Sequence, residues 1–135
     1  MAKERRLAMS DAEGDVLHAL WEHESGTVRE IQELLGRRGQ VWTRSTVITL
    51  LQRLEKKGYV TSDKRKFAFV FHPTVTREEV MHHRMLDLAD ELCAGETVPL
   101  VMAFAQRHRF TDAEIQQFRQ MIEVLEAKRR RRTTR

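Results

Sequence analysis

The chain has 135 residues, 41% of them hydrophobic and 33% charged, and a formal net charge of +4. That length suits one compact domain, or a small domain with an added assembly region. No apolar run approaches the roughly 20 residues that cross a bilayer. The opening residues MAKERRLAMSDAEG also lack the apolar segment of a secretion signal, so we expect a cytoplasmic protein with no membrane insertion.

One local pattern predicts four helix starts: a Ser or Thr followed three residues later by Glu, just before an apolar-periodic run. In this capping box the hydroxyl accepts from the third helical N–H, and the Glu carboxylate accepts from the N–H of the cap residue. The pattern predicts where helices begin and is silent about function. It occurs at Ser10 with Glu13, Thr27 with Glu30, Thr76 with Glu79, and Thr111 with Glu114.

Three short helices are expected in the first half of the chain. The first runs from Asp11 to His23, and the second from about Val28 to Leu35 with Gly36 as a left-handed cap. The third begins after Thr43 and ends at Gly58. Its apolar residues recur at three- and four-residue spacing, which predicts one buried stripe. These residues are Val47, Leu50, Leu51 and Leu54.

After Gly58 the hydrophobic period becomes that of β-strands. We expect one strand at residues 59–62, a polar basic tip at residues 63–66, and a second strand at residues 67–72, closed by Pro73. Phe67, Phe69 and Phe71 alternate along the second strand and are expected to pack inward or against the following helix. Three helices followed by a basic-tipped hairpin predict a winged helix-turn-helix.

The chain from Thr76 onward is predicted to form three helices: one that ends near Ala94 and Gly95, a short one with Pro99 in its first turn, and a last one from Thr111 to about Ala127. The apolar residues fall on stripes typical of helix pairing. Because a small winged helix cannot cover three such stripes, we predict a homodimer, with packing inside one chain as the alternative. The predicted interface residues are Met85, Leu88, Leu92, Ile115, Phe118, Ile122 and Leu125.

The predicted fold class is mainly α with a small β hairpin. A winged-helix DNA-binding domain is expected over residues 8–73, a helical dimerisation region over 76–127, and a basic disordered tail over 128–135. Charge differs sharply between these parts. Residues 37–66 contain nine Lys and Arg against two acids, a local charge of +7, while residues 74–127 sum to −5. The first segment therefore suits phosphates and the second does not.

The third helix has an outer face that suits a major groove, where base pairs differ in donors, acceptors and the thymine methyl. Ser45, Thr46, Thr49 and Gln52 are the predicted base-reading residues. Cations beside such a set more often hold phosphates than specify bases. The predicted phosphate contacts are Arg44, Arg53, Lys56, Lys64, Arg65 and Lys66. A merely soluble helix face is the simpler alternative, and a domain that docks on an acidic protein is another.

Catalytic patterns are missing from the sequence. It has no Gly-rich phosphate loop, no paired metal-binding His residues and no GxSxG turn, and its one cysteine, Cys93, lies in an apolar helical setting. We therefore expect no enzyme activity, no metal and no cofactor.

The order of these features resembles the penicillinase-repressor (BlaI/MecI) family of bacterial transcription repressors. The resemblance rests on LHALWEHESGTVREIQELL, TVITLLQRLEKKGYV and FTDAEIQQFRQMIEVLEA, and covers residues 8–127. It implies a homodimer whose winged helices bind an inverted-repeat operator in double-stranded DNA and block transcription. Members often carry a polar or basic residue where this chain has Ile48.

The resemblance also implies a switch. In the beta-lactam-responsive members a membrane sensor protease leads to cleavage in the dimerisation region, at a bond that precedes a Phe. The corresponding position here is Ala103–Phe104, with Ala103 where those members carry Asn. Cleavage there would separate the DNA-binding part from the last helix. Copper-responsive relatives carry a C-terminal Cys-x-Cys motif, which this chain lacks.

Overall fold

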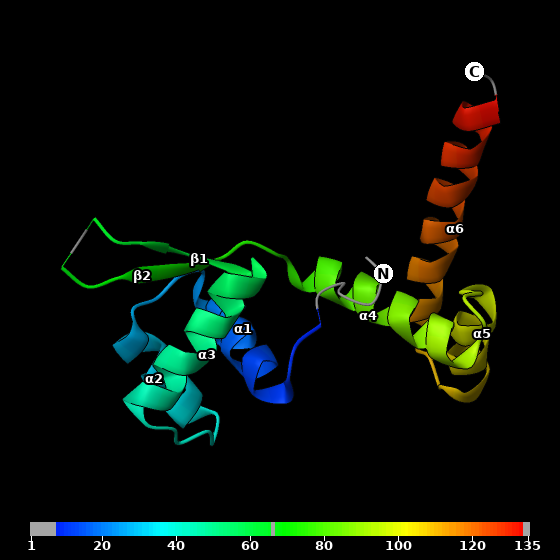
Figure 1. Ribbon diagram of the computed structural model, residues 1–135. Coiled ribbons are helices and arrows are strands. Elements are labelled where there is room, and N and C mark those ends of the chain that lie inside the picture. Colours follow the sequence, from blue (N-terminus) through cyan, green and yellow to red (C-terminus); the bar gives the residue numbers. More distant parts are fainter. Residues whose placement is uncertain (1–7, 66, 134–135) are drawn as a thin grey trace. The chain divides into compact units, whose positions relative to one another are not determined.

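The structure is a computed structural model that describes residues 8–65 and 67–133. It contains six helices and one two-stranded antiparallel hairpin within those ranges. The chain divides into two compact units, one up to Thr97 and one from Val98. Figure 1 labels the elements, and each unit is described by itself below. No helix in the described part of the chain is long and apolar enough to span a membrane.

The first three helices begin at the predicted residues, two of them at a capping box and the third after Thr43. They are α1 (Asp11–His23), α2 (Val28–Arg37) and α3 (Arg44–Lys57), and each follows a Ser or Thr cap whose hydroxyl accepts from the third helical N–H. Helix α3 ends at Gly58, whose φ of 86° favours glycine. The prediction for Gly36 was wrong, because α2 continues past it and Gly39 has the positive φ.

The core of the first unit lies where α1, α2 and α3 meet. The side chains of Leu17, Leu20, Ile31, Leu35 and Leu51 have no solvent-exposed area. The predicted stripe of α3 is buried in this core, with Val47, Leu50 and Leu54 beside Leu51. This packing leaves the opposite face of α3 in solvent.

The wing consists of β1 (Val60–Asp63) and β2 (Val70–Pro73). Val60 pairs with Pro73, and Asp63 pairs with Val70. Gly26, between α1 and α2, adds an isolated antiparallel bridge to β2: the backbone N–H groups of Gly26 and Phe71 each donate to the other residue's carbonyl, at 3.0 and 2.8 Å. A Cβ on Gly26 would meet Ile31 at 3.2 Å, so a side chain there would crowd this junction.

The predicted second strand is shorter than expected. Of its three Phe residues only Phe71 is buried, whereas Phe67 and Phe69 precede β2 and are exposed. The expectation that all three pack inward was therefore wrong. Phe71 pairs with Gly26 at the base of the wing, while the register of the ladder ends at Asp63 and Val70, so Phe67 and Phe69 lie beyond the last strand pair.

Helix α4 (Arg77–Leu92) belongs to the first compact unit, although we had grouped it with the dimerisation region. The start of α4 is attached to α1. The Trp21 indole N–H donates to the Val75 carbonyl at 2.8 Å, and the Arg77 guanidinium lies 5.7 Å from the Trp21 ring centroid. These contacts connect the start of α4 to the winged helix.

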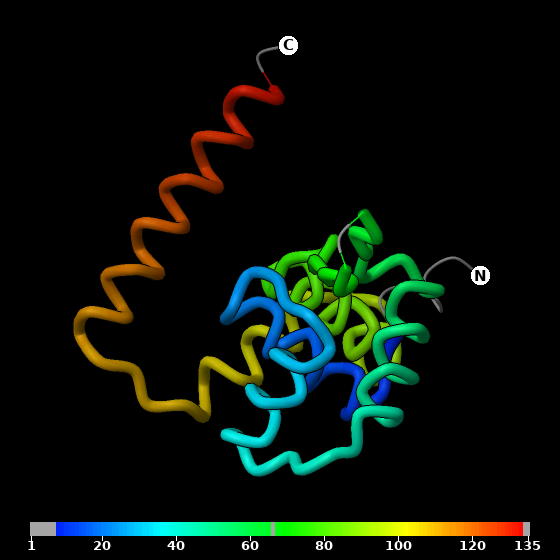
Figure 2. Tube along the Cα trace, turned by 90° about the vertical axis from the view of Figure 1, so that its left-hand side faces the viewer, coloured from blue at the N-terminus to red at the C-terminus, as the bar shows by residue number. Residues whose placement is uncertain are grey.

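The second unit contains α5 (Val98–Arg107) and α6 (Asp112–Thr133). Helix α6 continues six residues beyond the predicted end at Ala127, as one unbroken helix (Figure 2). The prediction of a disordered tail was therefore wrong for residues 128–133. Lys and Arg have good helix propensity, and cations interact favourably with the C-terminal end of a helix.

Candidate DNA-binding surface

The outer face of α3 presents the polar side chains that the sequence predicts. Ser45, Thr46, Thr49 and Gln52 are all exposed. The Thr43 hydroxyl oxygen accepts from the Thr46 N–H at 3.2 Å, and the Thr49 hydroxyl donates to the Ser45 carbonyl at 2.9 Å. The second bond uses the hydroxyl hydrogen of Thr49 and leaves the lone pairs of its oxygen available to a ligand.

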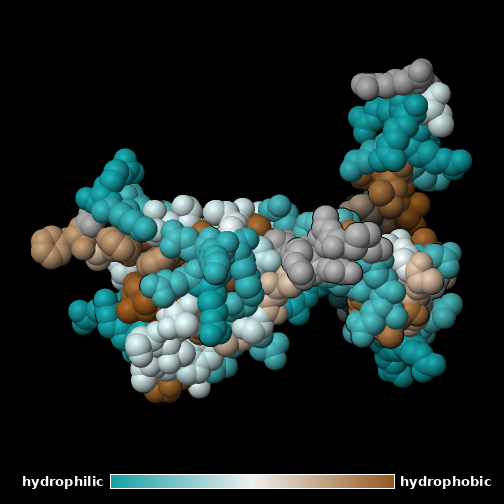
Figure 3. Space-filling model, viewed as in Figure 1, coloured by the Kyte–Doolittle hydropathy of each residue, from teal (hydrophilic) through white to brown (hydrophobic). Residues whose placement is uncertain are grey.

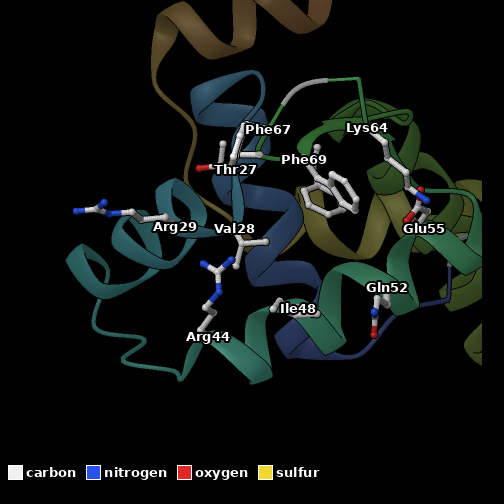
Figure 4. A pocket seen from close by; sticks show the side chains of 12 residues that line it. Thr27, Val28, Arg29, Arg44, Ile48, Gln52, Glu55, Lys64, Phe67 and Phe69 are labelled. Atoms are coloured by element: carbon white, nitrogen blue, oxygen red, sulfur yellow. The ribbon is translucent and has the colours of Figure 1, made fainter.

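This face divides into two rows that line different hollows. Ser45, Thr49 and Arg53, together with Thr46, line one hollow of about 250 Å³. Arg44, Ile48 and Gln52 form the other row, which lines a hollow of about 640 Å³ shared with the wing (Figure 4). Residues four apart project from the same side of a helix. The four predicted base-reading residues are therefore adjacent, but Gln52 lies on the wing side.

The wing brings cations beside this face. The Arg65 guanidinium donates twice to the Asp63 carboxylate, at 3.0 Å for each bond, and these bonds raise the pKa of Arg65. Lys64 instead lies over the Phe69 ring, with its Nζ 5.7 Å from the ring centroid. Figure 3 shows hydrophilic and apolar side chains next to each other on the wing. Lys66 lies outside the described residues.

The predicted phosphate contacts on α3 are also exposed. Arg44, Arg53 and Lys56 all lie in solvent. Arg44 is at the start of the helix and Lys56 in its last turn. The exposed cations therefore extend along α3 and continue on the wing with Lys64 and Arg65.

An ion pair between a buried carboxylate and an exposed lysine supports the end of α3, and the sequence did not predict it. The Glu13 side chain is almost completely buried, and its carboxylate accepts from Lys57 Nζ at 2.7 Å. Burial alone would raise the pKa of Glu13, but the hydrogen bonds from Lys57 and Ser10 and the positive charge of Lys57 outweigh burial and lower the pKa. The Tyr59 hydroxyl donates to the Ala8 carbonyl at 3.1 Å beside this pair.

The predicted dimerisation residues lie in both units and are exposed in each. On α4 these are Met85, Leu88 and Leu92. On α6 the side chains of Ile115, Phe118, Ile122 and Leu125 are between 40% and 55% exposed. Figure 3 shows the resulting apolar band on α6, which gives way to hydrophilic side chains toward the end of the helix.

The predicted cleavage position lies inside α5, where Ala103 and Phe104 are both exposed. The Phe104 ring stacks on His108 with centroids 5.0 Å apart, and Phe110 contacts Phe118 with centroids 4.9 Å apart. The bond between Ala103 and Phe104 is therefore part of a regular helix and next to a cluster of aromatic rings.

The match to a family model and the similarity to known relatives point to one family. The family model for penicillinase repressors matches residues 9–124. The penicillinase repressor of Bacillus licheniformis is 27% identical over 115 residues, covering 85% of this chain and 89% of that protein. The methicillin resistance regulatory protein MecI of Mammaliicoccus sciuri is 23% identical over 114 residues, covering 84% of this chain and 92% of that protein.

One solved structure is similar to part of this chain. The solution structure of the DNA-binding domain of the repressor BlaI is 31% identical to this chain. The match covers 55% of this chain and 89% of that domain, with a TM-score of 0.49.

Proposed function

The chain belongs to the penicillinase repressor family, and from this premise we propose that it is a homodimeric, sequence-specific DNA-binding repressor that acts at inverted-repeat operators. The observation that carries this proposal is the outer face of α3, where exposed hydrogen-bonding side chains lie among exposed cations. A repressor needs both, because phosphate contacts position the protein and base contacts specify the sequence.

Base recognition is assigned to Ser45, Thr46, Thr49 and Gln52. Thr offers a hydroxyl and a methyl, and Gln can donate to and accept from an adenine edge. Phosphate contact is assigned to Arg44, Arg53 and Lys56 on α3, and to Lys64, Arg65 and Lys66 on the wing. The winged-helix fold supports these assignments, because the apolar stripe of α3 is buried in the core while its polar face is exposed.

The homodimer is proposed from the apolar faces of the C-terminal helices. None of the described residues of α5 or α6 is buried, and α6 exposes an apolar row. A second copy of the chain would cover such a row by symmetric pairing, which is the commonest way in which soluble chains assemble. Two linked winged helices would then bind two half-sites together, and the combined affinity would exceed that of either alone.

Inactivation by proteolysis is the proposed switch, with a sensor-linked protease as partner and Ala103–Phe104 as the bond. Both residues are exposed, and a cut there would detach α6 from the DNA-binding unit. A protease needs an extended substrate, so α5 would have to unfold locally before cleavage.

The first experiment is selection of bound duplexes from a random pool at about 150 mM salt, a concentration near the physiological ionic strength. We expect enrichment of a two-fold symmetric motif whose half-sites lie one or more helical turns apart. If the pool stays unenriched and binding vanishes as salt rises, the proposal is wrong. The winged helix would then be a module that docks on an acidic protein.

A further inference from the structure

One side chain on the outer side of α3 is aliphatic. The other apolar residues of the helix, Val47, Leu50, Leu51 and Leu54, belong to the buried core. Ile48 does not belong to that core and is half-buried. It lies between Arg44 and Gln52 in the row that faces the wing (Figure 4). Solubility alone does not explain why an aliphatic side chain lies in an otherwise polar face.

The hollow in front of Ile48 has apolar walls and a cationic rim. Its volume is about 640 Å³, and Val28, Phe67 and Phe69 line it opposite α3. Three exposed cations, Arg29, Arg44 and Lys64, also line it, together with one half-buried carboxylate, Glu55. A partner that fits here is a polyanion that also presents an apolar group. Duplex DNA has that chemistry, because thymine carries a C5-methyl group at its major-groove edge.

We infer that Ile48 determines specificity by packing against a thymine C5-methyl group in each half-site, with Arg44 and Gln52 on either side of the contact. This inference rests on the proposed function and adds to it a preference for one base, supplied by an aliphatic side chain. Because 5-methylcytosine carries the same methyl at the same edge, a cytosine at that position should bind better when it is methylated.

The test uses the full chain and the duplex obtained by selection, with each thymine replaced in turn by deoxyuridine, which lacks only the methyl. At one position in each half-site the replacement should weaken binding about fourfold, the effect of removing one buried methyl group. In Ile48→Ala the difference between thymine and deoxyuridine at that position should disappear. Ile48→Val should keep part of the difference.

Val41→Ala is the matched control, because Val41 is a highly exposed aliphatic residue that does not line the hollow. This variant should show the same difference between thymine and deoxyuridine as the native chain. A methyl effect that persists in Ile48→Ala, or no methyl effect at any thymine, would overturn the inference while leaving the repressor proposal standing. Absence of any sequence preference in the selection would instead contradict the proposed function.

Discussion

The two compact units of this chain differ in how far their apolar residues are buried. The first unit encloses Leu17, Leu20, Ile31 and their neighbours in a closed core. The second begins its long helix α6 with a complete capping box at Thr111 and Glu114, yet none of the described residues of α5 or α6 is buried. The first unit supplies its own stability. The second has the secondary structure of a folded region without a core of its own, and the proposed homodimer would supply the missing apolar contacts.

The largest effect is expected from Phe118→Glu combined with Ile122→Glu, which places charges in the exposed row of α6. We expect monomers in sedimentation and a loss of operator affinity of about 10²–10⁴-fold, because simultaneous binding to two half-sites is lost. The control is Gln116→Glu with Gln120→Glu, which adds two carboxylates to the opposite face of the same helix. If both variants sediment alike, the α6 row is not a dimer interface.

A smaller effect is expected within the first unit, from Thr49→Ala combined with Gln52→Ala. Preference for the operator over random DNA should fall about 10- to 100-fold, because each good base contact contributes about 1–3 kcal/mol. The fold should be unaffected, since both residues lie outside the core. Lys56→Ala is the comparison variant and should weaken binding to all DNA sequences alike. Competition binding measures the affinity of each variant for the operator and for random DNA. An unchanged preference for the operator in the double variant would show that α3 is not the reading element.

The next effect concerns the stability of the first unit. Glu13→Gln should lower the free energy of unfolding by about 1–2 kcal/mol at pH 7, because a charged hydrogen bond is lost. The pKa of Glu13 is lowered in the folded chain. Its stabilisation is therefore present above the unfolded pKa of about 4.3 and is lost as pH falls through the lower folded value.

Urea unfolding at pH 7 and below pH 4 measures this effect, and the variant should lose less stability on acidification than the native chain. Glu33→Gln is the matched control, because Glu33 pairs with Arg29 on an exposed helix surface where ion pairs contribute little. Equal acid sensitivity of the native chain and Glu13→Gln would contradict the role of this pair.

The smallest effect is expected at the wing. Lys64→Ala should weaken binding to every sequence alike and reduce the slope of log affinity against log salt by about 0.9. Arg65→Ala should change the slope less, because Asp63 already engages the guanidinium through two hydrogen bonds. Titrations at several salt concentrations compare the two variants. An equal or larger change for Arg65→Ala would mean that the pair with Asp63 opens on DNA.

Local sequence patterns predicted most of the first unit. All four capping boxes form, with the Ser or Thr hydroxyl and the Glu carboxylate each accepting its backbone N–H. Thr43 and Gly58 bound the third helix as expected. A cap depends on residues within one turn, so a short window of sequence contains the information. The outward direction of Ser45, Thr49 and Gln52 followed from helical periodicity in the same way.

Other features depend on residues that are distant in the sequence, and these were missed. The Glu13–Lys57 pair joins the start of α1 to the end of α3. The inward position of Phe71 depends on Gly26, whereas Phe67 and Phe69 have the same alternation and remain exposed. The row formed by Arg44, Ile48 and Gln52 could be predicted from spacing, but the hollow in front of it requires the position of the wing.

The Gly26–Phe71 connection has a consequence for the order of folding. Its two hydrogen bonds join residues on either side of α2 and α3, so the connection closes a loop that contains both helices. The entropy of closing a loop is lost before its contacts stabilise it, so contacts between residues distant in the sequence tend to form later than local ones. The base of the wing should therefore reach its native position only after the helical core, and newly made chains should bury their leucines before they are able to recognise DNA.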